Sequence, residues 1–132
     1  LPKSWRRWAT ADREPIANWV HGRATMLGDA AHPTTQYMAQ GACMALEDAV
    51  TLGEALRLHG NDWDKALQLY QDSRVARTAR IVLSGREMGR LYHAMGVERL
   101  VRNSLWKGRS QERFYDAMEW LYGWNVDNCL AK

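Results

Sequence analysis

The stretch that decides the fold runs from residue 28 to residue 49. It begins Gly-Asp-Ala-Ala-His-Pro (28–33) and closes Gln-Gly-Ala-Cys-Met-Ala-Leu-Glu-Asp-Ala (40–49). An apolar run leads into it and a helical pattern leads out, so the order predicts a strand, a Gly-Asp turn, a small-residue loop and a helix. A helix that starts this way presents N–H groups without partners inside the helix, and such groups bind ligands. The stretch therefore predicts half of a cofactor site.

Upstream of the turn, the sequence predicts a loop followed by one short strand over residues 23–27. This strand is almost continuously apolar, which is typical of a buried parallel strand. Because one strand cannot form a sheet, we expect its partner strands to lie outside this chain. In the preceding loop, 1–22, Pro15 keeps the chain extended, and Asp12 and Arg13 could pair with each other.

Downstream, apolar spacing and glycine stops predict four helices followed by an irregular tail over 124–132. The second helix could break near Ser84–Gly85 or Gly89. The fold class is thus mainly α, with one short strand plus about four helices, and the short linkers argue against dividing the chain. The expected helices are 41–58, 62–94, 97–107 and 110–122. In the first of them, the residues expected on its buried face include Ala42, Ala45, Leu46, Ala49, Leu52 and Leu56.

The composition excludes several classes of protein. A chain of 132 residues can bury a real core, and 25% charged residues is ordinary for a soluble globular protein. No apolar run approaches the roughly 20 residues of a membrane helix, so we expect no membrane partner. The net charge of +3 is mild and spread along the chain, which does not predict nucleic acid as a partner. Cys43 and Cys129 match no metal-ligand spacing, so we expect no metal and a reduced, cytoplasmic protein.

Two groups of side chains leave alternatives open. Arg74, Arg77 and Arg80 lie three residues apart on one helical stripe. The stripe could bind phosphate or a partner, but a solvated helix face is the expected interpretation. Aromatic side chains near the C-terminus either pack the late helices onto the body or form a dimer interface. They are Trp106, Phe114, Tyr115, Trp120, Tyr122 and Trp124.

The segments 28–33 and 40–49 resemble the second FAD-binding motif of the single-component flavoprotein aromatic hydroxylases. The Asp-Arg-Glu-Pro at 12–15 is similar to the lead-in of this family. Residues 27–56 are most similar to members that convert 3-hydroxybenzoate to gentisate. The family also carries an N-terminal Gly-x-Gly-x-x-Gly motif for the ADP half of FAD and a central Asp-Gly motif for FAD and NAD(P)H. Neither motif occurs in this chain, which starts at a leucine, a hint that it is part of a longer protein.

The resemblance implies that the chain is the C-terminal segment of an α/β FAD/NAD(P)-binding Rossmann-like fold. Loop, strand and flavin loop would occupy 1–39, and the helical part 40–132. The implied activity is hydroxylation of a phenolic aromatic acid by O2, with FAD as cofactor and NAD(P)H as co-substrate. The partners would be that substrate and the missing N-terminal part of the enzyme, and the isolated chain should be inactive. The alternative is a non-enzymatic helical interaction or dimerisation module that keeps the motif as part of its fold.

The resemblance also assigns residues to the cofactor. Asp29 would hold the ribityl hydroxyls while Gly28 allows a close backbone approach, although an aspartate here could instead cap its own turn. The N–H groups of Gly41, Ala42 and Cys43 would hold the negative edge of the reduced flavin ring, worth about 0.3–1 kcal/mol at an exposed helix N-terminus. Small residues at these positions also let a helix pack closely on a sheet.

The loop after the motif is expected to lie over the reactive face of the flavin. Several family members have proline where this chain has Gln36, so the Gln36 amide is our candidate catalytic and substrate-binding group, unless it is simply a solvent-exposed loop residue. Tyr37 and Met38 are candidates for the substrate wall, and Gln40 for the flavin edge. His32 has no ligand-spaced partner and is expected to be a satisfied turn histidine rather than a general base or metal ligand.

Overall fold

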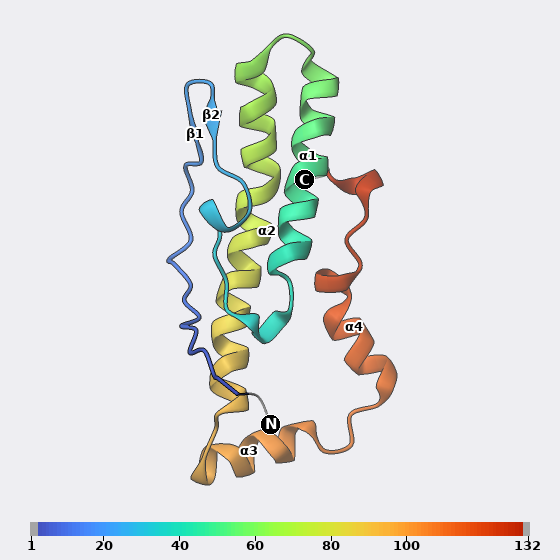
Figure 1. Ribbon diagram of the computed structural model, residues 1–132. Helices are drawn as coiled ribbons and strands as arrows, with labels where there is room; N and C mark the ends of the chain where they lie inside the picture. The colour runs from blue at the N-terminus through green and yellow to red at the C-terminus, as the bar shows by residue number, and fades with distance from the viewer. Residues whose placement is uncertain (1–2, 131–132) are drawn as a thin grey trace.

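The computed structural model describes residues 3–130, and most of them are helical (Figure 1). The helices are α1 (Gly41–His59), α2 (Trp63–Tyr92), α3 (Gly96–Trp106) and α4 (Gln111–Tyr122). Two short strands, β1 (Val20–His21) and β2 (Ala24–Thr25), precede them. The remaining elements are the 3-10 turns η1 (Gly28–Ala30), η2 (Gln36–Met38) and η3 (Val126–Asn128). The predicted mainly α fold class is confirmed.

Helices α1 and α2 form an antiparallel hairpin, and the short elements β1, η1, η2 and η3 pack against it (Figure 1). Gly60 ends α1 with a φ of +56°, which a glycine adopts without strain. Asp62 caps α2, because its side chain accepts a hydrogen bond from the Lys65 N–H at 3.2 Å. The second helix runs unbroken through Ser84–Gly85 and Gly89. Both helices were therefore predicted to within two residues at each end, since their caps are local signals.

The predicted strand over 23–27 was wrong in length and in pairing. Only Ala24–Thr25 is extended in the ladder, and it pairs antiparallel with Val20–His21 inside this chain. Gly22 has a φ of +56°, which permits the tight connection between the two strands. After the hairpin, only Met26 and Leu27 separate the end of β2 from the turn that begins at Gly28.

The predicted buried face of α1 was only partly right, because Leu52 and Leu56 pack against the core but Ala42, Leu46 and Ala49 are exposed. Leu46 is 69% exposed, whereas two acidic residues, Glu47 and Asp48, are buried beside Met44 and Thr51. Burial of carboxylates is unfavourable unless each is paired and hydrogen-bonded. The pairs that α2 supplies therefore decide which face of α1 points inward.

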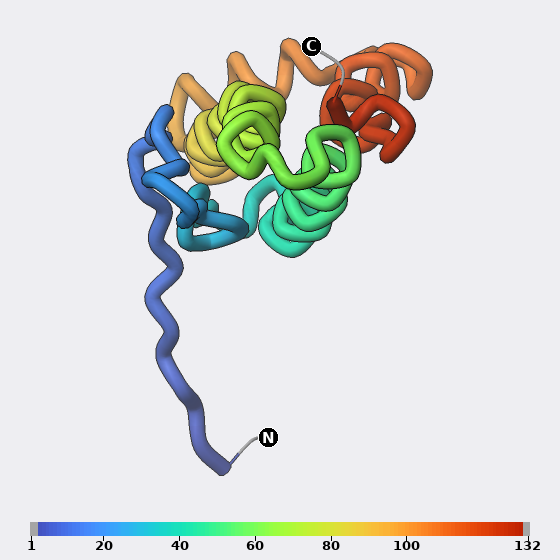
Figure 2. Tube along the Cα trace, turned by 90° about the horizontal axis from the view of Figure 1, so that it is seen from above, coloured from blue at the N-terminus to red at the C-terminus, as the bar shows by residue number. Residues whose placement is uncertain are grey.

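The last two helices attach differently to this hairpin. The C-terminal turn of α4 is held by Leu121, which is buried in a cluster with Met38, Met44 and Ile81. No residue of α3 is buried among those described. None of the helices in residues 3–130 is long and apolar enough to cross a membrane. The first described residues have no regular structure and project from the helical body in the view of Figure 2.

Candidate functional site

The turn at 28–32 is a tight unit that packs directly on α1. The N–H groups of Ala31 and His32 both donate to the Gly28 carbonyl oxygen at 2.9 Å. Gly28 itself is buried with a φ of +60°, and a Cβ atom there would lie 3.3 Å from the Ala45 Cβ. Only glycine combines this conformation with this contact. The turn is thereby placed against the first two turns of α1.

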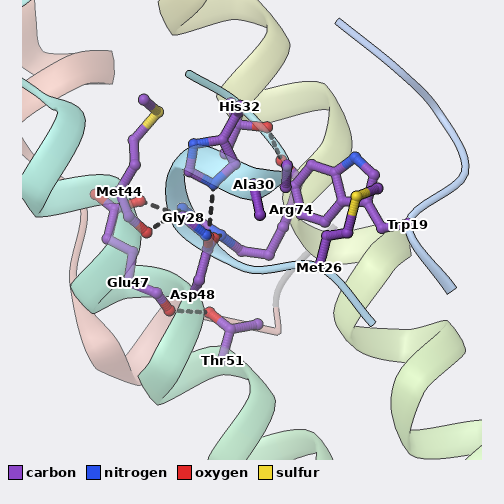
Figure 3. Close-up of polar contacts among 12 residues, drawn as sticks. Trp19, Met26, Gly28, Ala30, His32, Met44, Glu47, Asp48, Thr51 and Arg74 are labelled. Carbon is purple, nitrogen blue, oxygen red and sulfur yellow. Dashed lines mark hydrogen bonds and ion pairs between the residues drawn. The ribbon is translucent and has the colours of Figure 1, made fainter. Parts of the chain in front are cut away.

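A single buried carboxylate, that of Asp48 in α1, holds this turn (Figure 3). Its Oδ2 atom accepts hydrogen bonds from the Gly28 N–H at 2.9 Å and lies 2.5 Å from the His32 Nε2. Its Oδ1 atom accepts from the Arg74 Nε at 2.7 Å. Burial alone would raise the pKa of Asp48, but the donors His32, Gly28 and Arg74 together hold it below its usual value. Asp48 is therefore ionised. His32 lies in the turn as the sequence predicted, but only its Nε2 atom has a partner, and its buried Nδ1 atom has none within the described residues.

The neighbouring carboxylate, Glu47, pairs with the same side of α2. It lies 2.7 Å from the Arg74 Nη1 and accepts two 2.7 Å hydrogen bonds from Arg77. Arg77 continues to α4, where it donates to the carbonyl oxygens of Trp120 and Leu121 at 2.8 and 3.1 Å. Two carboxylates and two guanidinium groups thus join α1, α2 and the end of α4.

This network corrects the prediction of a solvated arginine stripe. Arg74 is fully buried, Arg77 is partly buried, and the exposed Arg80 lies over the Trp120 ring at 3.8 Å from its centre. Sequence reasoning missed the acidic partners altogether. The available signal was the Glu-Asp pair at 47–48 opposite arginines spaced by three on the next helix.

The N-terminal segment holds the turn from the opposite side. Arg13 donates from its Nη2 to the carbonyl oxygens of Ala30 and Ala31 at 2.7 and 2.9 Å. The expected pair between Asp12 and Arg13 does not form, because Asp12 instead accepts from Arg86 of α2 at 2.7 Å. The turn is consequently held by Asp48 of α1 and by Arg13 of the N-terminal segment. Arg74 of α2 contributes indirectly, because it fixes the Asp48 carboxylate.

Several donors and acceptors around this turn have no partner within residues 3–130, and their chemistry fits the polar edge of FAD. Asp29 is exposed, and among residues 3–130 its carboxylate has no hydrogen-bond partner, so it caps no turn. The Gln40 side chain is buried and does not cap α1, which leaves the N–H groups of residues 41–43 without partners in the described chain. Two further buried atoms without partners, His32 Nδ1 and Thr35 Oγ1, lie in the same loop. An acceptor for hydroxyls and a row of donors for a negative ring edge are what FAD requires.

The structure separates Gln36 from the other two residues predicted to face the substrate. Gln36 is exposed, whereas Met38 is buried in the cluster with Ile81 and Leu121. Tyr37 packs into a notch of α2 at Gly89, where a Cβ atom would lie 2.7 Å from its Cε2. Tyr37 and Met38 also line a cavity of about 710 Å³ between η2, α2, α3 and α4, with Phe114, Tyr115 and Tyr122 in its wall. Their assignment to the substrate stays a prediction.

Comparison with known proteins identifies the family. A family model described as an FAD binding domain matches residues 2–84. The chain belongs to this FAD binding domain family. It is 84% identical over all its residues to 3-hydroxybenzoate 6-hydroxylase 2 of Aquipseudomonas alcaligenes, and 81% identical to 3-hydroxybenzoate 6-hydroxylase of Polaromonas naphthalenivorans. It spans only 41% and 33% of the length of these relatives.

Two solved structures have the same fold over this segment. A salicylate hydroxylase substrate complex superposes with a TM-score of 0.74 at 31% identity, over 93% of this chain and 30% of that one. Klebsiella pneumoniae HpxO complexed with FAD and uric acid superposes with a TM-score of 0.71 at 32% identity, over 90% and 29% respectively. The family resemblance inferred from the motif is confirmed.

The ionised state of Asp48 predicts a loss of stability in acid. Its pKa in the folded protein is lower than the ordinary value of 3.8, so its contribution is present above pH 3.8 and is lost as the pH falls below that value. Thermal unfolding of the intact protein from pH 6 downward measures this loss. The Asp48→Asn variant should be less stable at pH 6, by about 3–5 kcal/mol, and should show a flatter decline below pH 3.8. Parallel declines in both proteins would contradict the assignment.

The Tyr37 notch predicts opposite effects for two helical glycines. In Gly89→Ala the new methyl group would overlap the Tyr37 ring, and such overpacking costs about 1–3 kcal/mol. Gly53→Ala in α1 is the matched control, because nothing lies within 4 Å of the added Cβ, and relief of glycine's helix penalty should stabilise by about 0.5–1 kcal/mol. Melting temperatures of the intact variants measure both, and a Gly89→Ala protein as stable as Gly53→Ala would refute the notch.

Proposed function

We propose that the intact protein containing this chain is an FAD-dependent monooxygenase that hydroxylates a phenolic aromatic acid with NAD(P)H and O2. One observation supports the proposal: the Gly28 turn, which carries the exposed Asp29, packs on α1 at Ala45, in the second turn from the uncapped N-terminus of that helix. Ala45 is four residues from Gly41, or about 6 Å along the helix axis. A hydroxyl acceptor and a set of N–H donors at this spacing suit one ligand.

Each residue of the site then has a distinct role. Bound FAD would supply hydride acceptance from NAD(P)H and the activation of O2. The Asp29 carboxylate would accept hydrogen bonds from the ribityl hydroxyls, beside Gly28. The N–H groups of Gly41, Ala42 and Cys43 would donate hydrogen bonds to the ring edge that carries negative charge in reduced flavin. Gln40, which is buried immediately before Gly41, would contribute to holding the same edge.

The loop at η2 is the substrate side of the proposed site. The exposed Gln36 amide can donate to and accept from a phenol, and we assign it to substrate positioning and catalysis. Tyr37 and Met38 support this loop and form the apolar wall behind it. The names of the 84% and 81% identical relatives support 3-hydroxybenzoate as the substrate, with gentisate as the product. The remaining sheet and the dinucleotide-binding part belong to the missing N-terminal segment of the enzyme.

The proposal predicts both a coloured protein and a substrate preference. The intact protein should bind FAD and, with NADH or NADPH, should consume O2 faster with 3-hydroxybenzoate than with salicylate or 4-hydroxybenzoate. An oxygen electrode with product chromatography measures this. A colourless protein whose melting temperature does not respond to FAD would instead support the non-enzymatic helical module. Faster turnover of either competitor would show that the substrate is wrong.

The same assay tests whether Gln36 positions the substrate or is only an exposed loop residue. In Gln36→Ala, loss of the amide should lower the yield of hydroxylated product per NAD(P)H oxidised, because the substrate is less well positioned. FAD affinity should stay unchanged, since this side chain lies outside the Asp29 and α1 contacts. A product yield equal to that of the wild type would contradict this role and would show that Gln36 is simply a solvent-exposed loop residue.

The proposed assembly is a cytoplasmic homodimer formed through α3 and α4. Exposed apolar side chains on these helices support it, among them Val97, Leu100, Leu105, Phe114 and Tyr115. Aromatic and aliphatic residues of this kind are enriched in the cores of subunit interfaces. The free thiols of Cys43 and Cys129 support a reducing compartment. Sedimentation velocity of the intact protein should give a two-subunit mass that Leu100→Glu reduces, and a one-subunit wild type would contradict the dimer.

A further inference from the structure

We propose that Asp48 is a positioning residue for the FAD site, which sets the place of the Asp29 carboxylate relative to the N–H donors of α1. The inference rests on the proposed function, because it concerns how the chain holds the same cofactor. Asp48 itself is buried beneath the turn and reaches the cofactor only through Gly28 and His32.

One oxygen atom of Asp48 holds both ends of the turn. Its Oδ2 atom bonds the Gly28 N–H and the His32 Nε2, which belong to residues four apart in the chain. Asp29 follows Gly28 directly and is exposed. Because both bonds converge on one atom, any displacement of the Asp48 carboxylate moves both ends of the turn, and the Asp29 side chain with it.

The other oxygen atom of Asp48 is fixed from α2. Arg74 donates to Oδ1 from its Nε at 2.7 Å, and its Nη2 lies 3.3 Å from the Met44 carbonyl oxygen. Both Asp48 and Arg74 are fully buried. A charge-assisted bond with this geometry, shielded from water, permits one orientation of the carboxylate rather than several.

The helix that carries Asp48 also carries the proposed flavin donors. Asp48 is seven residues from Gly41, which corresponds to about 10 Å along α1. Because the helix is rigid, the distance between Asp48 and the N–H groups at its N-terminus is constant. The bonds from Asp48 to the turn therefore fix the position of the turn relative to those N–H groups. Binding constellations need their groups held within about 0.5 Å of the productive geometry. Asp48 is placed to provide that accuracy.

Glu47 is the matched control for Asp48. It is the adjacent residue, it is buried, and it also pairs with Arg74. Its remaining partner is Arg77, and it makes no hydrogen bond to the turn. Neutralising Glu47 therefore breaks the same buried network without releasing Gly28 or His32. A purely structural role predicts that the two substitutions act alike on the cofactor.

The test compares FAD affinity in the Asp48→Asn and Glu47→Gln variants of the intact protein after the flavin has been removed. Titration with FAD, followed by quenching of flavin fluorescence, should give a Kd raised at least tenfold for Asp48→Asn, equivalent to about 1.4 kcal/mol. The Kd of Glu47→Gln should stay within about twofold of the wild type, although both variants melt at lower temperature. Equal changes in Kd, or no change in either, would overturn the inference.

A second variant keeps the test decisive if Asp48→Asn does not fold. His32→Asn removes one of the two bonds to Oδ2 and leaves the Gly28 bond in place. It should raise the Kd for FAD and alter the visible circular dichroism of the bound flavin, and a wild-type Kd and spectrum would overturn the inference. A wild-type protein that binds no FAD would mark the failure of the proposed function instead, so the two failures are distinguishable.

Discussion

The structure depends on one buried carboxylate and the constraint that it must be neutralised. Asp48 is taken wholly out of water, which is costly unless donors surround it. The donors come from the turn at Gly28 and His32 and from Arg74 in α2. Satisfying one charge therefore requires the turn, α1 and α2 to meet in a single arrangement. The adjacent Glu47 extends the requirement to Arg77 and, through it, to the end of α4.

This constraint explains how a cofactor loop can be tight and still expose unpartnered polar groups. The backbone of the turn is held from inside by Asp48 and from outside by Arg13, so its order does not depend on the Asp29 side chain. Asp29 and the first N–H groups of α1 are left free for a ligand. The two helices bring rigidity, and the loop that precedes α1 carries the polar groups free to bind a ligand, which is a common division of roles at binding sites.

The helices and the motif could be predicted from the sequence because their signals are local. Glycine and aspartate at 60 and 62 mark where α1 ends and α2 begins, and the motif at 28–33 points to the family. The buried face of α1 could not be read in the same way. It is decided by the pairs Asp48–Arg74 and Glu47–Arg77, whose members are separated by 26 and 30 positions in the sequence. The spacing of the arginines alone does not show whether they face water or carboxylates. The strand was misjudged because Gly22 folds the chain back on itself.

The most direct measurement is a crystal structure of the intact protein with FAD bound. The account predicts a ribityl hydroxyl at about 2.6–3.0 Å from the Asp29 carboxylate, and an oxygen or nitrogen of the ring edge at about 2.8–3.2 Å from an N–H of residues 41–43. It also predicts that the Asp48 bonds to Gly28, His32 and Arg74 are retained in the complex. An FAD that contacts neither Asp29 nor the N-terminus of α1 would contradict the account.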